Sequence, residues 1–213
     1  MEIIPKKISD YIKTHISEEP ETLKELNRET YAKILMPRML SGHEQGRVLS
    51  ILSKMCKPKY ILEIGTFTGY STICLAEGLE KDGLIYTIDI NEELEDFSKK
   101  YFVKVGIDHK VIQLTGDALE IIPNLQHTFD LIFLDADKKH YNSYLNLLLE
   151  KLNSGGFLIA DNVLWNGKVL ETNKNKDKDT LGVAEFNELV MKDQRIENII
   201  LPIRDGLNVI RKL

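Results

Sequence analysis

The chain has 213 residues, of which 43% are hydrophobic and 29% charged, with a formal net charge of -5 at pH 7. This composition excludes a disordered or collagen-like chain, and the length predicts a single domain. The acidic balance gives no electrostatic footprint for non-specific nucleic-acid binding. Cys56 and Cys74 lack zinc-site spacing, and neither a signal peptide nor an apolar membrane span is evident, so we expect a cytoplasmic protein with reduced thiols.

Residues 1 to about 55 show apolar residues at helical spacing, interrupted at Pro20 and Pro37. The first segment carries one apolar face, formed by Ile8, Tyr11, Ile12 and Ile16. We therefore predict a helical N-terminal cap over residues 1–55 and an α/β core over residues 56–213.

From Tyr60 onward, short apolar runs alternate with amphipathic segments, a pattern typical of βα units that feed a parallel sheet. Two further strands near the end, joined through Pro202 and the Asp205-Gly206 turn, predict an antiparallel hairpin. The polar segment 171–180 (ETNKNKDKDT) predicts a solvated loop. The seven predicted strands are Tyr60–Ile64, Leu84–Asp89, Lys110–Leu114, Phe129–Asp135, Gly156–Asp161, Ile196–Leu201 and Leu207–Arg211.

A glycine-containing turn follows the first predicted strand. Gly65 comes just after the strand and Gly69 at the start of the next helix, within the segment LEIGTFTGYS. Glycine lets the backbone turn sharply and approach a ligand, and a helix N-terminus offers free N–H groups to an anion. The spacing is GxxxG, so the dinucleotide fingerprint GxGxxG is not met, and a purely structural turn is the alternative.

The second strand ends at Asp89, whose carboxylate can accept hydrogen bonds from ribose hydroxyls. Together with the glycine turn, this predicts a ligand that contains adenosine. Gly116-Asp117-Ala118 follows the third strand at the same edge, where a backbone N–H and a carboxylate can bracket an adenine ring. Taken alone, Asp117 is nearly as well explained as a helix N-cap.

Acidic residues also follow the fourth and fifth strands, in the segments FLDADK and IADN. Asp135, Asp161 and Asn162 offer three hard oxygen ligands, an incomplete set for Mg²⁺ that leaves positions for water and substrate oxygens. Open α/β sheets bind ligands at this edge. The sequence therefore predicts a metal site, with Mn²⁺ or Ca²⁺ as the other candidates.

Several residues beside the acidic segments have two interpretations. Lys138, desolvated near a divalent cation, would be pushed toward its neutral form and act as a general base. Asp137 is better explained as a turn or helix-cap residue, although it can orient Lys138 or a water. Lys139 is better explained as a solvated surface charge. Trp165 is equally well explained as the wall of an aromatic pocket and as a core residue.

From about Met39 to the C-terminus, the chain resembles the cation-dependent O-methyltransferases, the group of caffeoyl-CoA and catechol O-methyltransferases. The segments LEIGTFTGYS, IDIN, GIDHKV, FLDADKKHY, IADNVLWNG and LPIRDGLNVIRK are similar to the family's motifs and follow in the same order. The resemblance implies a Rossmann-like class I methyltransferase fold and methyl transfer from S-adenosylmethionine (SAM) to a hydroxyl of a small catechol-like or phenylpropanoid substrate.

The resemblance also implies roles for individual residues. Asp135, Asp161 and Asn162 would hold the metal, Lys138 would be the base, and Trp165 would contact the substrate. The residues implied to line the SAM site are Met39, Ser41, Glu63, Gly65, Thr66, Ser71, Asp89, Asp117, Ala118 and Asp135. His43 can point toward the acceptor pocket, although a lone histidine is more often a surface or capping residue.

Two other functions stay open at this stage. Some bacterial relatives resemble tRNA hydroxyuridine methyltransferases, and a small basic face could come from Lys6, Lys7, Lys174, Lys176 and Lys178. A non-catalytic SAM-binding protein is the second, because a fold alone does not establish activity. The overall acidity and the absence of an added RNA-binding module argue against the tRNA enzyme, and the presence of all three expected metal ligands with Lys138 argues against the non-catalytic protein. The resemblance further implies a homodimer.

Overall fold

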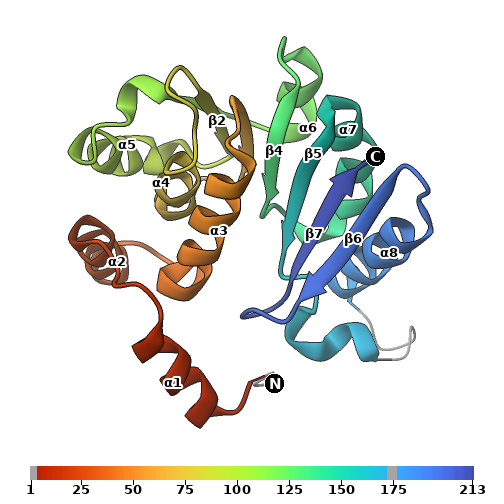
Figure 1. The fold of residues 1–213 in the computed structure, drawn as a ribbon, viewed down its shortest axis with the longest axis horizontal. Coiled ribbons are helices and arrows are strands. Elements are labelled where there is room, and N and C mark those ends of the chain that lie inside the picture. The colour runs from red at the N-terminus through yellow and green to blue at the C-terminus, as the bar shows by residue number, and fades with distance from the viewer. Residues whose placement is uncertain (1–3, 172–176) are drawn as a thin grey trace. The chain divides into compact units, whose positions relative to one another are not determined.

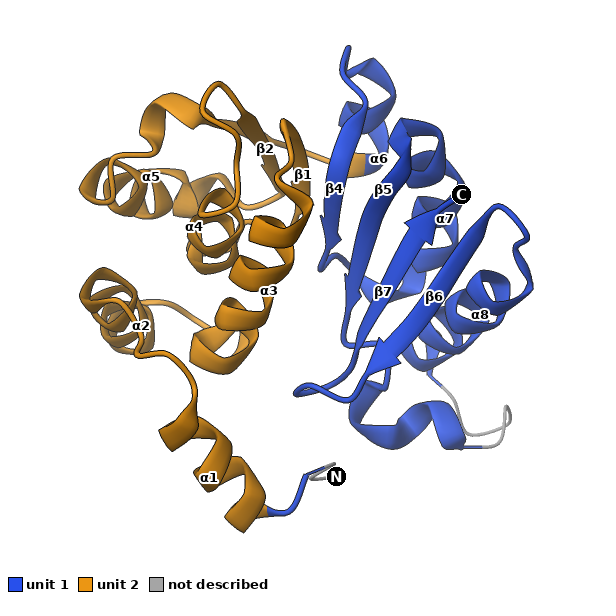
Figure 2. Ribbon diagram, viewed as in Figure 1, with its two compact units in different colours: residues 1–5, 119–213 blue, residues 6–118 orange. Residues whose placement is uncertain are grey.

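The computed structural model describes residues 4–171 and 177–213. The chain divides into two compact units, which Figure 2 colours separately. Unit 2 comprises residues 6–118, and unit 1 comprises residues 119–213 with the start of the chain. The predicted boundary between a cap and a core at residues 55 and 56 stays untested, and the N-terminal helices group with the first three strands.

Unit 2 contains three parallel strands in the order β3-β2-β1. Its helices belong to the first half of the chain (Figure 1). Leu62 is aligned with Tyr86, and Tyr86 with Ile112. Its elements are α1 Lys6–His15, α2 Glu21–Lys33, η1 Pro37–Met39, α3 Gly42–Cys56, β1 Tyr60–Ile64, α4 Tyr70–Ala76, β2 Leu84–Asp89, η2 Glu92–Leu94, α5 Glu95–Lys104, η3 Asp108–Lys110 and β3 Val111–Thr115, where η denotes a 3-10 helix.

The helical pattern is interrupted at both prolines, as the sequence predicted, and a new helical element begins at each. Pro20 occupies the N-cap position of α2, and Pro37 begins η1. The apolar face predicted for the first helix is not part of the core, because α1 has no buried residue and Ile8 and Tyr11 are 52% and 62% exposed. Helical spacing shows which residues share a face, but it does not show whether anything covers that face.

Unit 1 contains the strands β4-β5-β7-β6, in which β4 and β5 are parallel and β7 is antiparallel to both β5 and β6. The predicted C-terminal hairpin is therefore confirmed. The elements that lie in this unit are η4 Ile122–Asn124, β4 Phe129–Leu134, η5 Lys138–His140, α7 Tyr141–Lys151, β5 Leu152–Asp161, η6 Trp165–Leu170, α8 Lys178–Lys192, β6 Ile196–Leu201 and β7 Leu207–Lys212, while α6 Ala118–Ile121 begins at the boundary.

The strand order of the seven-stranded sheet is β3-β2-β1-β4-β5-β7-β6, which confirms the predicted mixed sheet with antiparallel C-terminal strands. β5 begins at Leu152, four positions before the predicted start, because Leu152 pairs with Phe129 ahead of a register shift. The predicted loop 171–180 extends too far. Asp177 caps α8, which begins at Lys178, by accepting a 2.7 Å hydrogen bond from the Thr180 N–H. Residues 172–176 lie outside the described chain.

Buried aliphatic and aromatic side chains from strands and helices form the core of each unit. In unit 2 they include Leu49, Ile61, Leu62, Tyr101 and Phe102, and in unit 1 Phe129, Phe133, Leu148, Phe186 and Ile210. Nearly every residue of β4 is buried, as expected for a parallel strand covered on both faces, whereas β6 is mostly exposed. None of the described helices is long and apolar enough to cross a membrane.

Candidate functional site

The glycine turn in unit 2 depends on backbone conformations that favour glycine. Gly65 and Gly69 have φ values of +104° and +86°, and the Gly69 N–H closes the turn on the Thr66 carbonyl at 2.8 Å. A Cβ at Gly69 would lie only 2.6 Å from the ring of Phe102 on α5. The Gly65 N–H donates to the Ile88 carbonyl at 2.9 Å, which fixes the turn to the end of β2.

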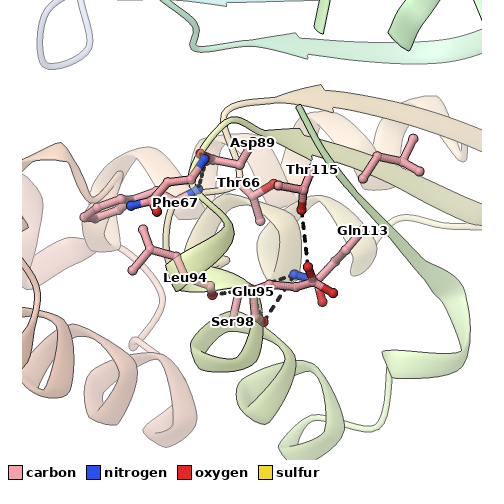
Figure 3. A pocket seen from close by; sticks show the side chains of 10 residues that line it. Thr66, Phe67, Asp89, Leu94, Glu95, Ser98, Gln113 and Thr115 are labelled. Atoms are coloured by element: carbon pink, nitrogen blue, oxygen red, sulfur yellow. Dashed lines mark hydrogen bonds between the residues drawn. The ribbon is translucent and has the colours of Figure 1, made fainter. Parts of the chain in front are cut away.

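Asp89 ends β2 and holds the same turn through its carboxylate (Figure 3). Its two oxygens accept hydrogen bonds from the Phe67 N–H at 2.7 Å and the Asn91 N–H at 2.9 Å. A carboxylate has about four acceptor positions, so Asp89 can accept further bonds from ribose hydroxyls. The Gly116 N–H donates to the Asp89 carbonyl at 2.9 Å, which brings the end of β3 to this edge.

A pocket opens beside Asp89, between the glycine turn, the end of β3 and the start of α5 (Figure 3). On its α5 side, Gln113 donates to the Ser98 hydroxyl at 2.7 Å, and Thr115 donates to the Glu95 carboxylate at 3.2 Å. The residues that line it are Thr66, Phe67, Asp89, Asn91, Leu94, Glu95, Ser98, Gln113, Leu114 and Thr115. The residues on the α5 side of this pocket were not predicted from the sequence. The one feature that could have indicated them is the spacing of Glu95 and Ser98, which places these two residues on the same helix face.

Glu63, expected from the resemblance to line the SAM site, is fully buried. One of its oxygens accepts hydrogen bonds from the hydroxyls of Thr72 at 2.5 Å and Thr87 at 2.6 Å. Glu63 therefore connects β1 to α4 and β2, and β1 and α4 are the elements on either side of the glycine turn. A direct contact of Glu63 with SAM stays a prediction.

The other expected cofactor residues divide between the units. In unit 2, Met39 is 57% exposed at the end of η1, Ser41 is buried at the N-cap of α3, and Ser71 and Ala118 are also buried. Asp117 is exposed and directly precedes α6, so both of its interpretations stay open. Asp135 belongs to unit 1. His43 contacts the Ser17 carbonyl through Nε2 at 2.7 Å, so it connects the α1–α2 linker to α3.

The expected metal ligands lie together at the ends of two paired strands in unit 1. Leu134 and Ala160 are aligned in the parallel ladder of β4 and β5, so Asp135 and Asp161 come next on neighbouring strands. Asn162 has a left-handed backbone with φ of +58°, and its N–H donates to the Asp161 carboxylate at 2.7 Å. This set contains only two carboxylates, because its third member is an amide. Among the described residues, no group of three His, Cys, Asp or Glu side chains could hold a metal ion.

Lys138 lies beside these carboxylates and is only 6% exposed. Its ammonium contacts the Asp135 carboxylate at 2.7 Å and the Tyr141 hydroxyl at 2.8 Å. Burial lowers the pKa of Lys138, but the electrostatic effects of Asp135, Tyr141 and Asp161 outweigh burial and raise it above its ordinary value in the absence of a cation. The predicted neutral Lys138 depends on a bound divalent cation, so it stays a prediction.

The neighbouring charged residues face solvent. Asp137 is at the N-cap position of η5 and pairs with Lys139 at 2.8 Å, and both side chains are nearly half exposed. Asp137 therefore acts as a turn residue and does not orient Lys138 through a direct contact. Lys139 is the surface charge that the sequence predicted.

Trp165 is half-buried in a strained loop that follows Asn162. Trp165 and Asn166 have φ values of +46° and +55°, conformations that non-glycine residues seldom adopt. The turn of the β6–β7 hairpin holds this loop: Asp205 accepts from the Leu164 N–H at 2.9 Å through its carbonyl and from the Asn166 N–H at 2.5 Å through its carboxylate. Strain of this kind persists where surrounding contacts enforce it, and it is frequent at functional sites.

Comparison with known proteins identifies the class of protein that this fold and these residues define. A family model described as O-methyltransferase matches residues 13–213. Caffeoyl-CoA O-methyltransferase 2 of Populus trichocarpa is 35% identical over 92% of this chain and 83% of its own length. Probable caffeoyl-CoA O-methyltransferase 2 of Dictyostelium discoideum is 31% identical over 97% and 91%.

Solved structures agree. The O-methyltransferase from Bacillus cereus, in complex with S-adenosylhomocysteine, matches with a TM-score of 0.89 and 30% identity over 97% of both chains. The methyltransferase PaMTH1 of Podospora anserina, also bound to S-adenosylhomocysteine, matches with a TM-score of 0.89 and 27% identity over 99% of this chain and 98% of that one. The chain therefore belongs to the O-methyltransferase family, in the cation-dependent class I group, and it is a SAM-dependent O-methyltransferase of the caffeoyl-CoA type.

Proposed function

We propose that this enzyme requires a divalent cation and methylates one of two adjacent hydroxyls on a small aromatic substrate. The observation that carries the proposal is the placement of Asp135 and Asp161 at the ends of paired strands, with the buried Lys138 in contact with Asp135 and with Asn162 directly after Asp161. These are hard oxygen donors of the kind that Mg²⁺ and Mn²⁺ prefer, and Ca²⁺ is a further candidate. The donor set fits a cation.

Asp135, Asp161 and Asn162 would hold the cation. A divalent ion there lowers the pKa of a nearby hydroxyl and favours two adjacent substrate oxygens over one. With a cation held by Asp135 and Asp161, the negative charge of these carboxylates would stabilise the Lys138 ammonium less, and burial would then favour the neutral amine. Lys138 would accept the proton of the reacting hydroxyl, and the resulting oxyanion would take the methyl group of SAM in line.

The cofactor residues of unit 2 would bind the adenosine half of SAM. Asp89 would accept hydrogen bonds from the ribose hydroxyls while it holds the glycine turn through Phe67 and Asn91. Comparison structures bound to S-adenosylhomocysteine support this use of the fold. The other expected cofactor residues, Met39, Ser41, Thr66, Ser71, Asp117 and Ala118, are proposed on the resemblance.

The metal requirement is tested by chelation. Transfer of a methyl group from SAM to a catechol should vanish in EDTA and return with Mg²⁺ or Mn²⁺. Asp161→Ala should abolish turnover and Mn²⁺ binding, measured by electron paramagnetic resonance, and leave SAM affinity nearly unchanged. Asp137→Ala is the control, because it removes an exposed aspartate two residues after Asp135 that pairs with Lys139. Full activity in chelator contradicts the proposal.

The acceptor is tested by a screen with radiolabelled SAM. We expect vicinal diphenols and caffeoyl esters to react better than monophenols, with several ring systems accepted and weak control over which hydroxyl reacts. Trp165 would form one wall of the acceptor pocket. Methylation of hydroxyuridine tRNA alone would favour the tRNA alternative. Its proposed basic face is divided, because Lys6 and Lys7 lie in unit 2 and Lys178 in unit 1, while Lys174 and Lys176 lie outside the described residues.

We also propose a homodimer in the cytoplasm. Exposed apolar side chains are frequent in the N-terminal helices of unit 2 and their linker, and a second copy would cover them. They are Ile8, Tyr11, Tyr31, Leu35, Met36, Ile51 and Met55. Cys74 is buried and Cys56 half-buried, and we expect both thiols to be reduced, as in a reducing compartment. Light scattering at the monomer mass over a wide concentration range would exclude the dimer.

A further inference from the structure

Tyr141, the first residue of α7, is fully buried beside the proposed catalytic lysine. Its hydroxyl lies 2.8 Å from Lys138 Nζ, 3.1 Å from the Leu134 carbonyl and 3.0 Å from the Asp161 carbonyl. Leu134 directly precedes Asp135. A single hydroxyl therefore connects the lysine to the backbone at the ends of both strands that carry the proposed carboxylate ligands.

The hydrogen-bonding capacity of the groups determines the direction of these contacts. The Lys138 ammonium can only donate, so the Tyr141 oxygen accepts from it. The hydroxyl's own proton then goes to one of the two carbonyls, Leu134 or Asp161, which face it at similar distances. A second N–H of the ammonium is directed at Asp135. Two of the three N–H donors of the Lys138 ammonium are thereby fixed; in the neutral amine, the third position is the lone pair, which is left to accept a proton from a reacting group.

The surroundings hold both residues in place. The Tyr141 ring packs edge-on against Phe186 of α8, with ring centroids 5.2 Å apart and an interplanar angle of 68°. α8 also approaches the backbone of Lys138 closely, because a Cβ at Gly182 would lie 2.4 Å from the Lys138 carbonyl oxygen. Backbone and side chain of Lys138 are therefore held from two directions.

We infer that Tyr141 is a positioning residue for methyl transfer: its hydroxyl sets the direction of the Lys138 amine relative to the ends of β4 and β5. The inference rests on the proposed role of Lys138 as the base. It assigns to Tyr141 no contact with SAM, the cation or the acceptor. Removal of the hydroxyl should therefore impair proton removal and leave the binding of each ligand intact.

The test is Tyr141→Phe, which keeps the ring and its contact with Phe186. We expect kcat to fall about 10- to 100-fold, the range for loss of a hydrogen bond that orients a functional group. The KM for SAM and the Kd for Mn²⁺, measured without SAM or acceptor, should stay within about threefold, since no ligand contact is lost. Tyr101→Phe is the control, because it removes another buried tyrosine hydroxyl, one that donates to Glu29 in unit 2.

A double-mutant cycle separates positioning from a general structural effect. In the Lys138→Met background, Tyr141→Phe should lower kcat by less than about twofold, because a hydroxyl that acts through the amine has nothing left to orient. Equal losses of kcat in both backgrounds, or an unchanged kcat in the single variant, would overturn the inference.

A measurement on the wild-type protein needs neither a variant nor turnover. In metal-free protein labelled with ¹⁵N-lysine, the Lys138 ammonium should exchange its protons with water far more slowly than exposed lysines do, because it is buried and doubly hydrogen-bonded. Exchange as fast as that of exposed Lys139 would refute the geometry. If slow exchange is found but no diphenol is methylated, the proposed function fails while the arrangement of Tyr141 and Lys138 is confirmed.

Discussion

Gly69→Ala should both destabilise the protein and weaken SAM binding. At a φ of +86°, an L-residue costs about 1 to 2 kcal/mol more than glycine. The new Cβ would also lie 2.6 Å and 2.8 Å from two atoms of the Phe102 ring, a buried side chain with little room to move. Overpacking of this kind adds about 1 to 3 kcal/mol. Together the two costs come to about 2 to 5 kcal/mol of unfolding free energy.

Gly106→Ala is the matched control. Gly106 has a similar φ of +72°, but a Cβ there would meet no atom within 4 Å, so only the backbone cost of about 1 to 2 kcal/mol applies. Urea unfolding should therefore place Gly69→Ala below Gly106→Ala in stability. Calorimetry with SAM should show weaker binding for the Gly69 variant only, because its clash shifts the turn that Asp89 holds. Equal stabilities and unchanged SAM affinity would refute the reasoning.

Two other changes test single groups of unit 2. Asp89→Ala should weaken SAM binding by roughly 1 to 3 kcal/mol, since ribose hydroxyls lose their acceptor; unaltered affinity in calorimetry would contradict the assignment. Glu77 tests electrostatics: burial raises its pKa, but hydrogen bonds from Arg47, Lys54 and Ser50 outweigh burial and lower it from 4.5 to about 2. Because folding lowers this pKa, its contribution to stability is present above pH 4.5 and lost as the pH falls toward 2, so a Glu77→Gln variant should show a shallower decline in Tm over that window.

The strands were predictable because each is a short apolar run, a pattern that can be read from a few consecutive residues. The predicted bounds of β1, β2 and β6 agree with the structure residue for residue. Gly65 and Asp89 were recognisable for a related reason, since a parallel sheet brings the ends of its strands to one edge and the sequence shows which residues follow each strand. Spacing along the chain was sufficient for these features.

Contacts between distant segments were not predictable in the same way. Glu63 has the residue type of a ligand acceptor, yet its carboxylate is occupied by the hydroxyls of Thr72 and Thr87 on two other elements. The apolar face of α1 has the pattern of a core helix, yet no residue of α1 is buried. In both cases the sequence pattern predicted the strand or helix correctly. The role of Glu63 and the exposure of the α1 face depend on residues that are distant in the sequence.

Lys138 shows why the charge state of a site residue needs its whole environment. In the metal-free protein, Asp135, three positions earlier, and Asp161, on the next strand, outweigh the effect of burial and raise the pKa of Lys138. The same two carboxylates are the proposed metal ligands, so the protonation of Lys138 and the occupancy of the metal site are linked. If Asp135 and Asp161 bind a cation as proposed, metal binding should release a proton from Lys138, and a pH-stat titration of metal-free protein with Mn²⁺ would detect that proton; no proton release on Mn²⁺ binding would contradict the proposed link.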